Sequence, residues 1–138
     1  MADQFHDRVH TIMTTKVFSL RPTDSVRTAI RLLLDNGISG APVVEDGTGK
    51  LLGLITEYDL ILAVHHVGWG LDVRQIMKTD ILTVKSDAPI AEITDLMITQ
   101  KIRRVLVVND EGQPVGIVAR RDIIAAYYDD GPQAQPGA

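Results

Sequence analysis

The segments Val9–Met13 (VHTIM) and Val73–Met77 (VRQIM) begin two copies of one pattern, 64 residues apart. The same offset relates Leu32 to Leu96, Ile38 to Ile102, Val43-Val44 to Val107-Val108, and Asp46 to Asp110. After a one-residue deletion it relates Gly53 to Gly116, Asp59 to Asp122, Ile61 to Ile124, and Ala63 to Ala126. A period that persists through turns and helices indicates one supersecondary unit used twice. We therefore expect two like units about a pseudo-twofold axis, with a cleft that presents similar groups from both sides.

The length and composition are those of a globular protein. A chain of 138 residues fits one compact domain, and 45% hydrophobic with 23% charged residues is ordinary for this class. Each repeat, at roughly 55 residues, is short for a stable core of its own. We therefore expect the two halves to share one core.

Composition also excludes several classes of function. The chain has no cysteine, which rules out disulfides and cysteine-ligated zinc, and its four histidines come without an acidic ligand cluster, so we expect no metal. No apolar run approaches the ~20 residues that span a bilayer, and no secretory signal is visible, so we expect a cytoplasmic address and no membrane partner. The 14 basic and 18 acidic residues give a net charge of −4, which argues against a nucleic-acid partner.

The first repeat reads as β-α-β-β-α behind a lead-in helix. The expected elements are a helix over 4–14, a strand over 16–20 that stops at Pro22, a helix from Val26 to Asn36, strands over 41–44 and 51–56, and a helix over 57–66. Thr23, Asp24 and Ser25 offer N-cap oxygens to the helix, and Gly37 can take the left-handed conformation that ends it. The two strands are close enough in sequence to form a hairpin.

The second repeat follows the same order. Its expected elements are strands over 81–84, 105–108 and 114–119, and helices over 90–101 and 120–128. The fold class is therefore α+β, with the first repeat in residues 1–66, a connector in 67–72, the second repeat in 73–130, and a disordered tail in 131–138.

The segment Gly53–Leu60 (GLITEYDL) carries the chemistry. Thr56 stands at a strand–helix junction, where its hydroxyl can cap the helix, and Asp59 lies three residues on at the same side. A carboxylate there can accept two hydrogen bonds from the cis-diol of a ribose, and the helix N-terminus favours a phosphate. The alternative is a capping box, in which Thr56 and Asp59 satisfy only each other's backbone amides.

In order, these motifs resemble a tandem pair of cystathionine-β-synthase (CBS) domains, a stand-alone Bateman module. The matching segments are the two V-x-x-I-M openers, GAPVVED (Gly40–Asp46), GLITEYDL (Gly53–Leu60), RRVLVVND (Arg103–Asp110) and GIVARRDI (Gly116–Ile123). The resemblance covers residues ~9 to ~128. It implies a CBS-pair fold and a regulatory binder of adenosine ligands, with two sites in the cleft between the repeats.

The resemblance also implies which residues form each site. In the first site, Thr56 and Asp59 hold the ribose, Leu54, Leu82 and Ile102 line the base, and Arg103 and Arg104 take phosphate. In the second site, Asp122 holds the ribose, Ile117, Phe18, Ile38 and Ser39 surround the base, and Arg120 or Arg121 lies near phosphate. Tyr58, Gly40 and Ala119, which flank these positions, complete the expected set.

One position departs from the family pattern. Ala119 replaces the hydroxyl residue that Thr56 supplies in the first repeat. A hydroxyl there would cap the helix and touch ribose or phosphate. We therefore expect the Asp59 site to bind more tightly than the Asp122 site.

The functional expectation is a regulatory module for energy sensing rather than an enzyme. No catalytic triad, Walker A motif or G-x-G-x-x-G is visible. The expected ligand is AMP, ADP, ATP or a related adenosyl compound such as S-adenosylmethionine, with no other cofactor. The expected assembly is a homodimer that signals to an unknown effector protein, and candidate contact residues are Ile61, Leu62, Val64, Ile124 and Tyr127. A ligand-free dimerisation or interaction scaffold is the alternative.

Overall fold

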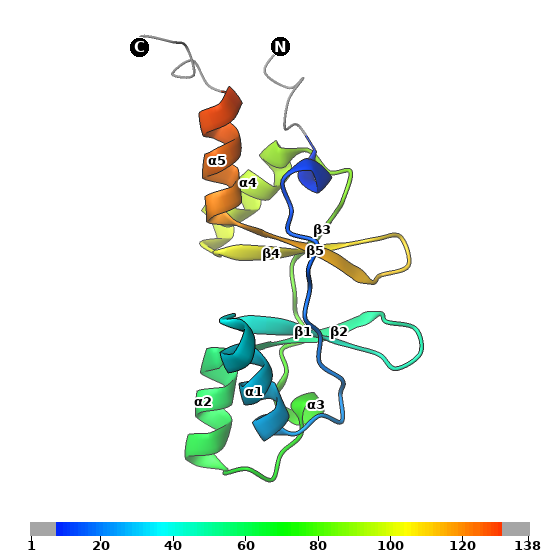
Figure 1. Ribbon diagram of the computed structural model, residues 1–138, viewed down its shortest axis with the longest axis vertical. Coiled ribbons are helices and arrows are strands. Elements are labelled where there is room, and N and C mark those ends of the chain that lie inside the picture. The colour runs from blue at the N-terminus through cyan, green and yellow to red at the C-terminus, as the bar shows by residue number, and fades with distance from the viewer. Residues whose placement is uncertain (1–7, 131–138) are drawn as a thin grey trace. The chain divides into compact units, whose positions relative to one another are not determined.

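The computed structural model describes residues 8–130, which fall into two compact units (Figure 1). Unit 2 comprises Val17–Ile81 and Glu111–Pro114, and unit 1 comprises Leu82–Asp110 with the described residues before Val17 and after Pro114. The predicted disordered tail (131–138) and the start of the predicted lead-in helix (4–7) lie outside the described residues.

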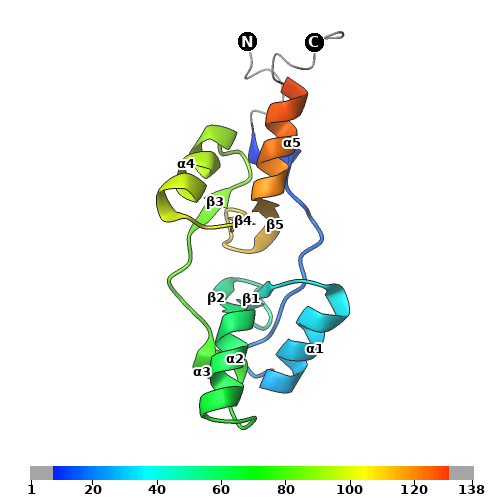
Figure 2. The same ribbon diagram turned by 90° about the vertical axis from the view of Figure 1, so that its left-hand side faces the viewer.

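Unit 2 is an antiparallel hairpin covered by two helices. Its elements are α1 (Val26–Asn36), β1 (Gly40–Val44), β2 (Leu51–Thr56), α2 (Glu57–His66) and the short α3 (Val73–Ile76). Strands β1 and β2 pair with Ala41 opposite Ile55, and α1 and α2 lie side by side on one face of the hairpin (Figure 2). The buried side chains of this unit are Leu20, Val26, Ala29, Leu33, Ala41, Val43, Ile55, Leu60, Ala63 and Val73.

Unit 1 repeats this arrangement with an additional strand. Its elements are β3 (Thr83–Lys85), α4 (Ile90–Gln100), β4 (Arg104–Val108), β5 (Pro114–Ala119) and α5 (Arg120–Asp130), and the sheet order is β3-β4-β5 with β3 parallel to β4. Its buried side chains are Val9, Val84, Ala88, Ile90, Ile93, Met97, Val105, Val107, Val118, Ile123 and Ala126. The predicted α+β fold with two repeats is confirmed, although only the second repeat has a strand before its first helix. The expectation of one shared core is wrong, because each helix-covered sheet buries its own cluster.

The residues that flank α1 and α4 explain where these helices start or end. The Ser25 hydroxyl accepts a hydrogen bond from the Thr28 amide at 3.0 Å, which caps the start of α1. Gly37 ends α1 in the left-handed conformation with φ 61°. Lys101, its counterpart after α4, takes the same conformation with φ 53°, although a lysine tolerates it less well than glycine. Backbone geometry at this turn is therefore conserved between the repeats while the residue is not.

The opening segments are exchanged between the sequence repeats. The segment around Met13, at the start of the first repeat, belongs to unit 1, and Met77, at the start of the second, belongs to unit 2. A Cβ atom at Gly116 would lie 2.4 Å from the Met13 sulfur, and one at Gly53 would lie 2.5 Å from the Met77 sulfur. Each methionine therefore packs on a glycine of the other repeat, in a space that only glycine leaves open.

Two predicted elements near the N-terminus are wrong. Within 8–14 the structure has only a 3-10 turn over Val9–Thr11, because the Val9 and His10 amides bond to the Ala88 and Ser86 carbonyls at 2.9 Å instead of to a helix. No strand covers 16–20. Leu20 forms an isolated bridge there, through two backbone bonds of 2.9 Å on either side of Val43. The strand predicted over 81–84 is shifted to Thr83–Lys85.

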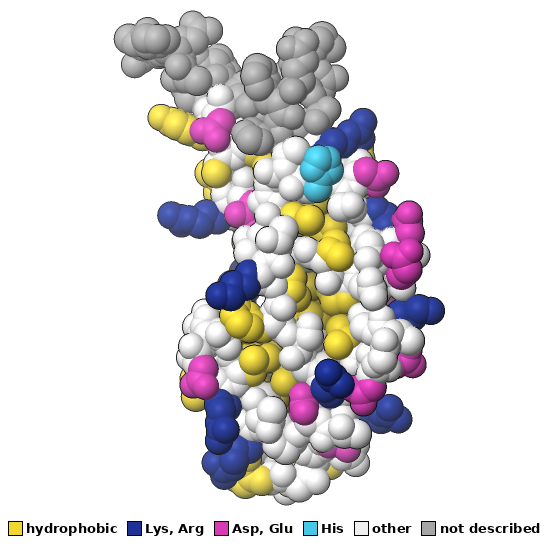
Figure 3. Space-filling model, turned by 45° about the vertical axis from the view of Figure 1, so that its right-hand side comes forward, with side chains coloured by type: hydrophobic (Ala, Val, Ile, Leu, Met, Phe, Trp, Pro, Cys, Tyr) yellow, Lys and Arg dark blue, Asp and Glu magenta, His cyan; other side chains and the backbone are white. Residues whose placement is uncertain are grey.

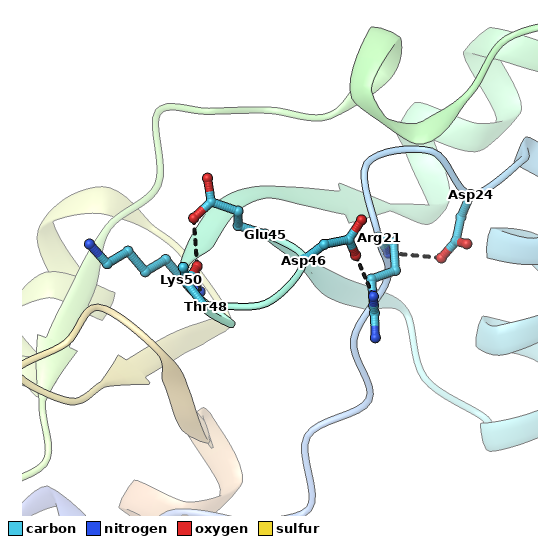
Figure 4. Close-up of polar contacts among 6 residues, drawn as sticks. All are labelled: Arg21, Asp24, Glu45, Asp46, Thr48 and Lys50. Atoms are coloured by element: carbon cyan, nitrogen blue, oxygen red, sulfur yellow. Dashed lines mark hydrogen bonds and ion pairs between the residues drawn. The ribbon is translucent and has the colours of Figure 1, made fainter.

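Equivalent ion pairs tie each hairpin turn to the chain that precedes the first helix of its unit. Arg21 pairs with Asp46 at the β1–β2 turn, and its backbone amide bonds to Asp24 at 2.8 Å (Figure 4). In unit 1 the corresponding pair, Lys85 and Asp110, is 3.0 Å apart. Since all four side chains are more than half exposed, each pair contributes only about 0–1 kcal/mol.

Candidate functional site

In unit 2 the predicted ribose-binding pair sits where β2 meets α2. Thr56 is the extended N-cap residue of α2, and its hydroxyl accepts a hydrogen bond from the Asp59 amide at 3.3 Å. The Asp59 Oδ2 in turn accepts from the Thr56 amide at 3.0 Å and from the Thr56 hydroxyl at 2.8 Å. The capping box anticipated from the sequence is therefore formed, and it fixes the direction of the Asp59 carboxylate.

The other carboxylate oxygen of Asp59 accepts no hydrogen bond from the described residues. Asp59 is only 8% exposed. Among the described residues, every fully buried side-chain oxygen has a hydrogen-bond partner. Because the capping bonds all go to Oδ2, Oδ1 reaches the surface, and its cationic neighbour is Lys78 with Nζ 3.8 Å away. The positive end of α2 and this lysine both balance the negative charge of the carboxylate.

Backbone contacts bring the start of β1 against the same junction. The Glu57 amide bonds to the Ser39 carbonyl at 3.0 Å, and Gly40 pairs with Thr56 across the hairpin. A Cβ atom at Gly40 would lie 3.0 Å from the Ile55 carbonyl oxygen, which explains a glycine at this point. Ser39 and Gly40 are therefore neighbours of Thr56 and Asp59 within unit 2.

Sequence reasoning missed Lys78. Its backbone forms two hydrogen bonds with Leu54, of 2.8 and 2.9 Å, so the chain after Met77 runs beside β2. A signal for it was available, since Lys78 directly follows the second V-x-x-I-M motif. The repeat pattern alone did not reveal that this segment packs on the first repeat.

The β5–α5 junction of unit 1 reproduces the geometry with fewer bonds. The Ala119 amide donates to the Asp122 Oδ2 at 2.8 Å, but alanine has no hydroxyl to supply the other two bonds of the capping box. Thr14 occupies the place that Lys78 has in unit 2, and its backbone exchanges two 2.9 Å bonds with Ile117. Asp122 therefore has no capping hydroxyl at residue 119 and no lysine at the position that corresponds to Lys78.

Two predicted phosphate ligands lie at this second junction. The Arg120 amide bonds to the Arg103 carbonyl at 3.1 Å, which matches the Glu57–Ser39 contact of unit 2. The Arg120 guanidinium donates from Nε to the Ile102 carbonyl at 3.2 Å. Unit 1 thus brings Ile102, Arg103 and Arg120 close to Asp122. The assignment of Arg103 and Arg104 to the Asp59 ligand stays a prediction.

The remaining predicted residues differ in exposure. Tyr58 and Arg121 are exposed on the first turns of α2 and α5, and Arg104 is exposed at the start of β4. Half-buried positions are Leu54, Phe18, Ile38 and Ile117, whereas Leu82 is 43% exposed before β3. On the face drawn in Figure 3, basic and acidic side chains are interspersed. No helix among residues 8–130 is long and apolar enough to cross a membrane.

Comparisons with known proteins identify the same two repeats. The CBS domain model matches residues 9–66 and 73–129. The uncharacterized protein MJ1225 of Methanocaldococcus jannaschii is 29% identical over 130 residues, which cover 83% of this chain but only 46% of that protein. The chain thus spans less than half the length of that relative.

Two solved structures share the fold along nearly their whole length. The CBS domain pair of protein MJ0100, in complex with 5′-methylthioadenosine and S-adenosyl-L-methionine, has a TM-score of 0.77 and 27% identity, with 90% of this chain and 98% of that chain covered. The structure of CBSX2 in complex with AMP has a TM-score of 0.77 and 26% identity, with coverage of 89% and 97%. CBS pairs of this kind are regulatory ligand-binding modules. With two matched repeats and these structural relatives, the chain belongs to the CBS domain family.

Proposed function

We propose that this chain binds an adenosine-containing ligand at the β2–α2 junction and uses binding to regulate a partner protein. The observation that carries the proposal is the Asp59 carboxylate, which is held by Thr56 through Oδ2 and has no hydrogen bond at Oδ1. A ribose hydroxyl can donate to such an oxygen, and hydrogen bonds to a charged group contribute about 1.5–3 kcal/mol each. The relatives solved with AMP, S-adenosyl-L-methionine and 5′-methylthioadenosine support an adenosyl compound as ligand.

The cation beside the carboxylate favours a ligand with a phosphate or another negative group. The Lys78 side chain is 57% exposed, so its ammonium can turn from Asp59 towards an incoming anion. The positive end of the α2 dipole attracts the same kind of group. AMP, ADP and ATP therefore match both the Asp59 carboxylate and the Lys78 ammonium. S-adenosylmethionine matches only the carboxylate, through its ribose.

The Asp122 junction is a weaker site in this proposal. Asp122 keeps one of the three bonds seen at Asp59 and has no counterpart of Lys78. Its carboxylate is consequently less well oriented before a ligand arrives, and a less preorganised group contributes less to affinity.

A ligand-free scaffold is the second candidate function. The observation in its favour is that Thr56 and Asp59 satisfy each other without a ligand, as a capping box does in any helix. In this case the duplicated helices would serve only for association with a partner.

Thermal unfolding with adenosyl compounds separates the two candidates. The probes are AMP, ADP, ATP, S-adenosylmethionine and 5′-methylthioadenosine. A ligand at about 100 times its Kd adds about 2.7 kcal/mol, which corresponds to roughly 10 °C for a domain of this size. No shift with any of the five compounds would favour the scaffold.

Calorimetry on matched variants then locates the site. Asp59→Asn should weaken binding of the active compound at least tenfold, and Asp122→Asn should weaken it less. Asp46→Asn is the control, because Asp46 lies at the hairpin turn and pairs with Arg21. A larger loss from Asp122→Asn than from Asp59→Asn would overturn the proposed ranking of the sites.

A further inference from the structure

The strand–helix junctions of the two units differ strongly in charge at equivalent positions. In unit 1 the residues around the start of β4 and the first turn of α5 include five cations, Lys101, Arg103, Arg104, Arg120 and Arg121. The residues at the matching positions of unit 2 are Gly37, Ser39, Gly40, Glu57 and Tyr58. The two sets differ by six charges, because they sum to +5 in unit 1 and to −1 in unit 2. We call the five cations the basic junction.

Two hydrogen bonds join the two segments that form the basic junction. The Arg120 amide donates to the Arg103 carbonyl at 3.1 Å, and the Arg120 Nε donates to the Ile102 carbonyl at 3.2 Å. All five cations belong to unit 1. Because only Nε takes part in this bond, Arg120 still has its two terminal nitrogens to offer to a ligand.

The basic junction has little acidic charge to balance it. Neither of the segments 100–109 and 114–121 contains an acidic residue, and the next carboxylate is that of Asp122. Lys101, Arg103 and Arg121 are exposed and form no ion pair with any other residue in the described part of the chain. With Asp122 included the local charge is +4, in a chain whose net charge is −4. Since like charges at close range repel one another, the junction favours the binding of an anion.

One of the five cations is retained in an unfavourable backbone conformation. Lys101 follows α4 with φ 53° and ψ 39°, and no other non-glycine residue of the described chain has a positive φ. In unit 2 the same place after α1 is taken by Gly37 with φ 61°. Glycine adopts this conformation without strain, whereas a lysine does not. The turn itself therefore gains nothing from a lysine, and its positive charge is what distinguishes it from the glycine.

The number and the kind of cations indicate a ligand with several linked phosphates. A single phosphate carries about −1.5 to −2 charge near pH 7, so it balances only about half of the local charge. A diphosphate or triphosphate carries more charge and presents oxygens on each phosphorus. Four of the five cations are arginines, and each planar guanidinium can bond to two oxygens of one phosphate.

We propose that the basic junction of unit 1 binds a chain of two or more linked phosphates, either free or as the polyphosphate part of a nucleotide. This inference goes beyond the proposed function, since it needs neither an adenosine group nor Asp59. It also makes the two junctions selective for different ligands. The Asp59 junction has Lys78 beside the carboxylate and Glu57 at the start of α2, so it lacks a comparable positive charge.

Calorimetry with inorganic tripolyphosphate, in the absence of divalent cations, tests the site without any nucleoside. The double variant Arg103→Ser, Arg121→Tyr introduces the residues that unit 2 has at these positions, and it should raise the Kd at least about tenfold. Arg31→Ser is the control, because Arg31 is an exposed cation on α1 of unit 2, and it should change the Kd less than about twofold. No binding of tripolyphosphate, or an unchanged Kd in the double variant, would overturn the proposal.

Inorganic phosphate and added salt examine the kind of contact. At equal ionic strength, inorganic phosphate should bind at least about tenfold more weakly than tripolyphosphate. Equal affinities would overturn the requirement for linked phosphates. Because the cations are exposed, the Kd for tripolyphosphate should rise several-fold when sodium chloride is raised from about 0.05 to about 0.3 M. A Kd that does not change with salt would contradict a contact made by exposed charges.

The variant Lys101→Gly separates loss of binding from loss of the fold. It should raise the Kd for tripolyphosphate by about threefold, since one exposed cation is removed. Its urea midpoint should stay the same or increase, because glycine suits the left-handed conformation at this turn. An unchanged affinity would show that the lysine charge is not used and would contradict the proposal. Circular dichroism of the double variant establishes in the same way that it is folded.

ATP distinguishes the two sources of linked phosphates, when it is measured in the Asp59→Asn background. If the ligand is a nucleotide, ATP should bind more tightly than tripolyphosphate, and Asp122→Asn should remove this advantage together with the ribose contact. If the ligand is free polyphosphate, both compounds should bind alike with or without Asp122→Asn. Either result supports the phosphate site. Failure of the proposed adenosine site would instead appear with AMP and adenosine, and it would leave the binding of tripolyphosphate unchanged.

Discussion

Thr56→Ala converts the β2–α2 junction into the arrangement that Ala119 has in the second repeat. The hydroxyl of Thr56 makes two hydrogen bonds, one from the Asp59 amide at 3.3 Å and one to the Asp59 Oδ2 at 2.8 Å. Removal of an N-cap hydroxyl costs about 1 kcal/mol, and loss of the bond to the buried carboxylate adds a similar amount. We expect the free energy of unfolding to fall by about 2 kcal/mol in total.

The reverse change, Ala119→Thr, restores the missing hydroxyl in the second repeat. The Ala119 amide already bonds to Asp122 at 2.8 Å, so the carboxylate is in place to accept from a new hydroxyl. Because Asp122 is less buried than Asp59, we expect a gain of up to about 1 kcal/mol. The variant should also narrow any difference in ligand affinity between the two junctions.

Urea unfolding followed by circular dichroism measures both changes. A loss of about 2 kcal/mol corresponds to a fall in Tm of roughly 8 °C for a domain of this size. Thr56→Ser keeps a hydroxyl in the same position and should lie within about 0.5 kcal/mol of the unmodified protein. If Thr56→Ala unfolds at the same urea concentration as the unmodified protein, the capping box does not stabilise α2 and the reasoning is refuted.

Three further substitutions test the strand–helix junctions and the exchanged opening segments. Gly53→Ala should destabilise the protein by about 2–3 kcal/mol in urea unfolding, since the new Cβ meets the Met77 sulfur at 2.5 Å and the Lys78 carbonyl at 2.8 Å. Gly116→Ala should cost less, about 1 kcal/mol, because its close neighbours all belong to a methionine side chain that can turn away, and equal losses would contradict this account. Lys78→Met should change stability by less than about 1 kcal/mol but weaken AMP several-fold in calorimetry, with adenosine unaffected. An equal loss for adenosine would exclude a phosphate contact.

Local signals in the sequence account for most of the elements. The apolar spacing of α1, the Ser25 cap and the Gly37 turn all act within a few residues, and the structure confirms the predicted helix over Val26–Asn36. The same holds for the hairpin and for α2, whose start at Glu57 follows from the Thr56 cap. Capping and periodicity are short-range effects, so one copy of the pattern was sufficient to predict them.

The pairing of distant segments was not predictable in this way. The segment over 16–20 has strand-like residues, but a strand forms only where a neighbouring strand pairs along its length, and here the pairing is an isolated bridge between Leu20 and Val43. The helix predicted over 4–14 gives way, in its described part, to bonds between Val9 and His10 and the chain before α4. In both places the tertiary structure, and not the local preference, decided which hydrogen bonds form.

By itself, the sequence determined the duplicated α-β-β-α core of each unit, the family, and the carboxylate at each strand–helix junction, because each depends on residues that are near one another in the chain. Tertiary structure decided that each opening segment completes the other repeat, and hence that Lys78 lies beside Asp59 while Thr14 takes its place in unit 1. The two opening segments, Val9–Met13 and Val73–Met77, are nearly identical in pattern. Their sequences alone therefore do not show which repeat each of them packs against. The choice between them depends on chain connection and packing over the whole fold, which no local spacing records.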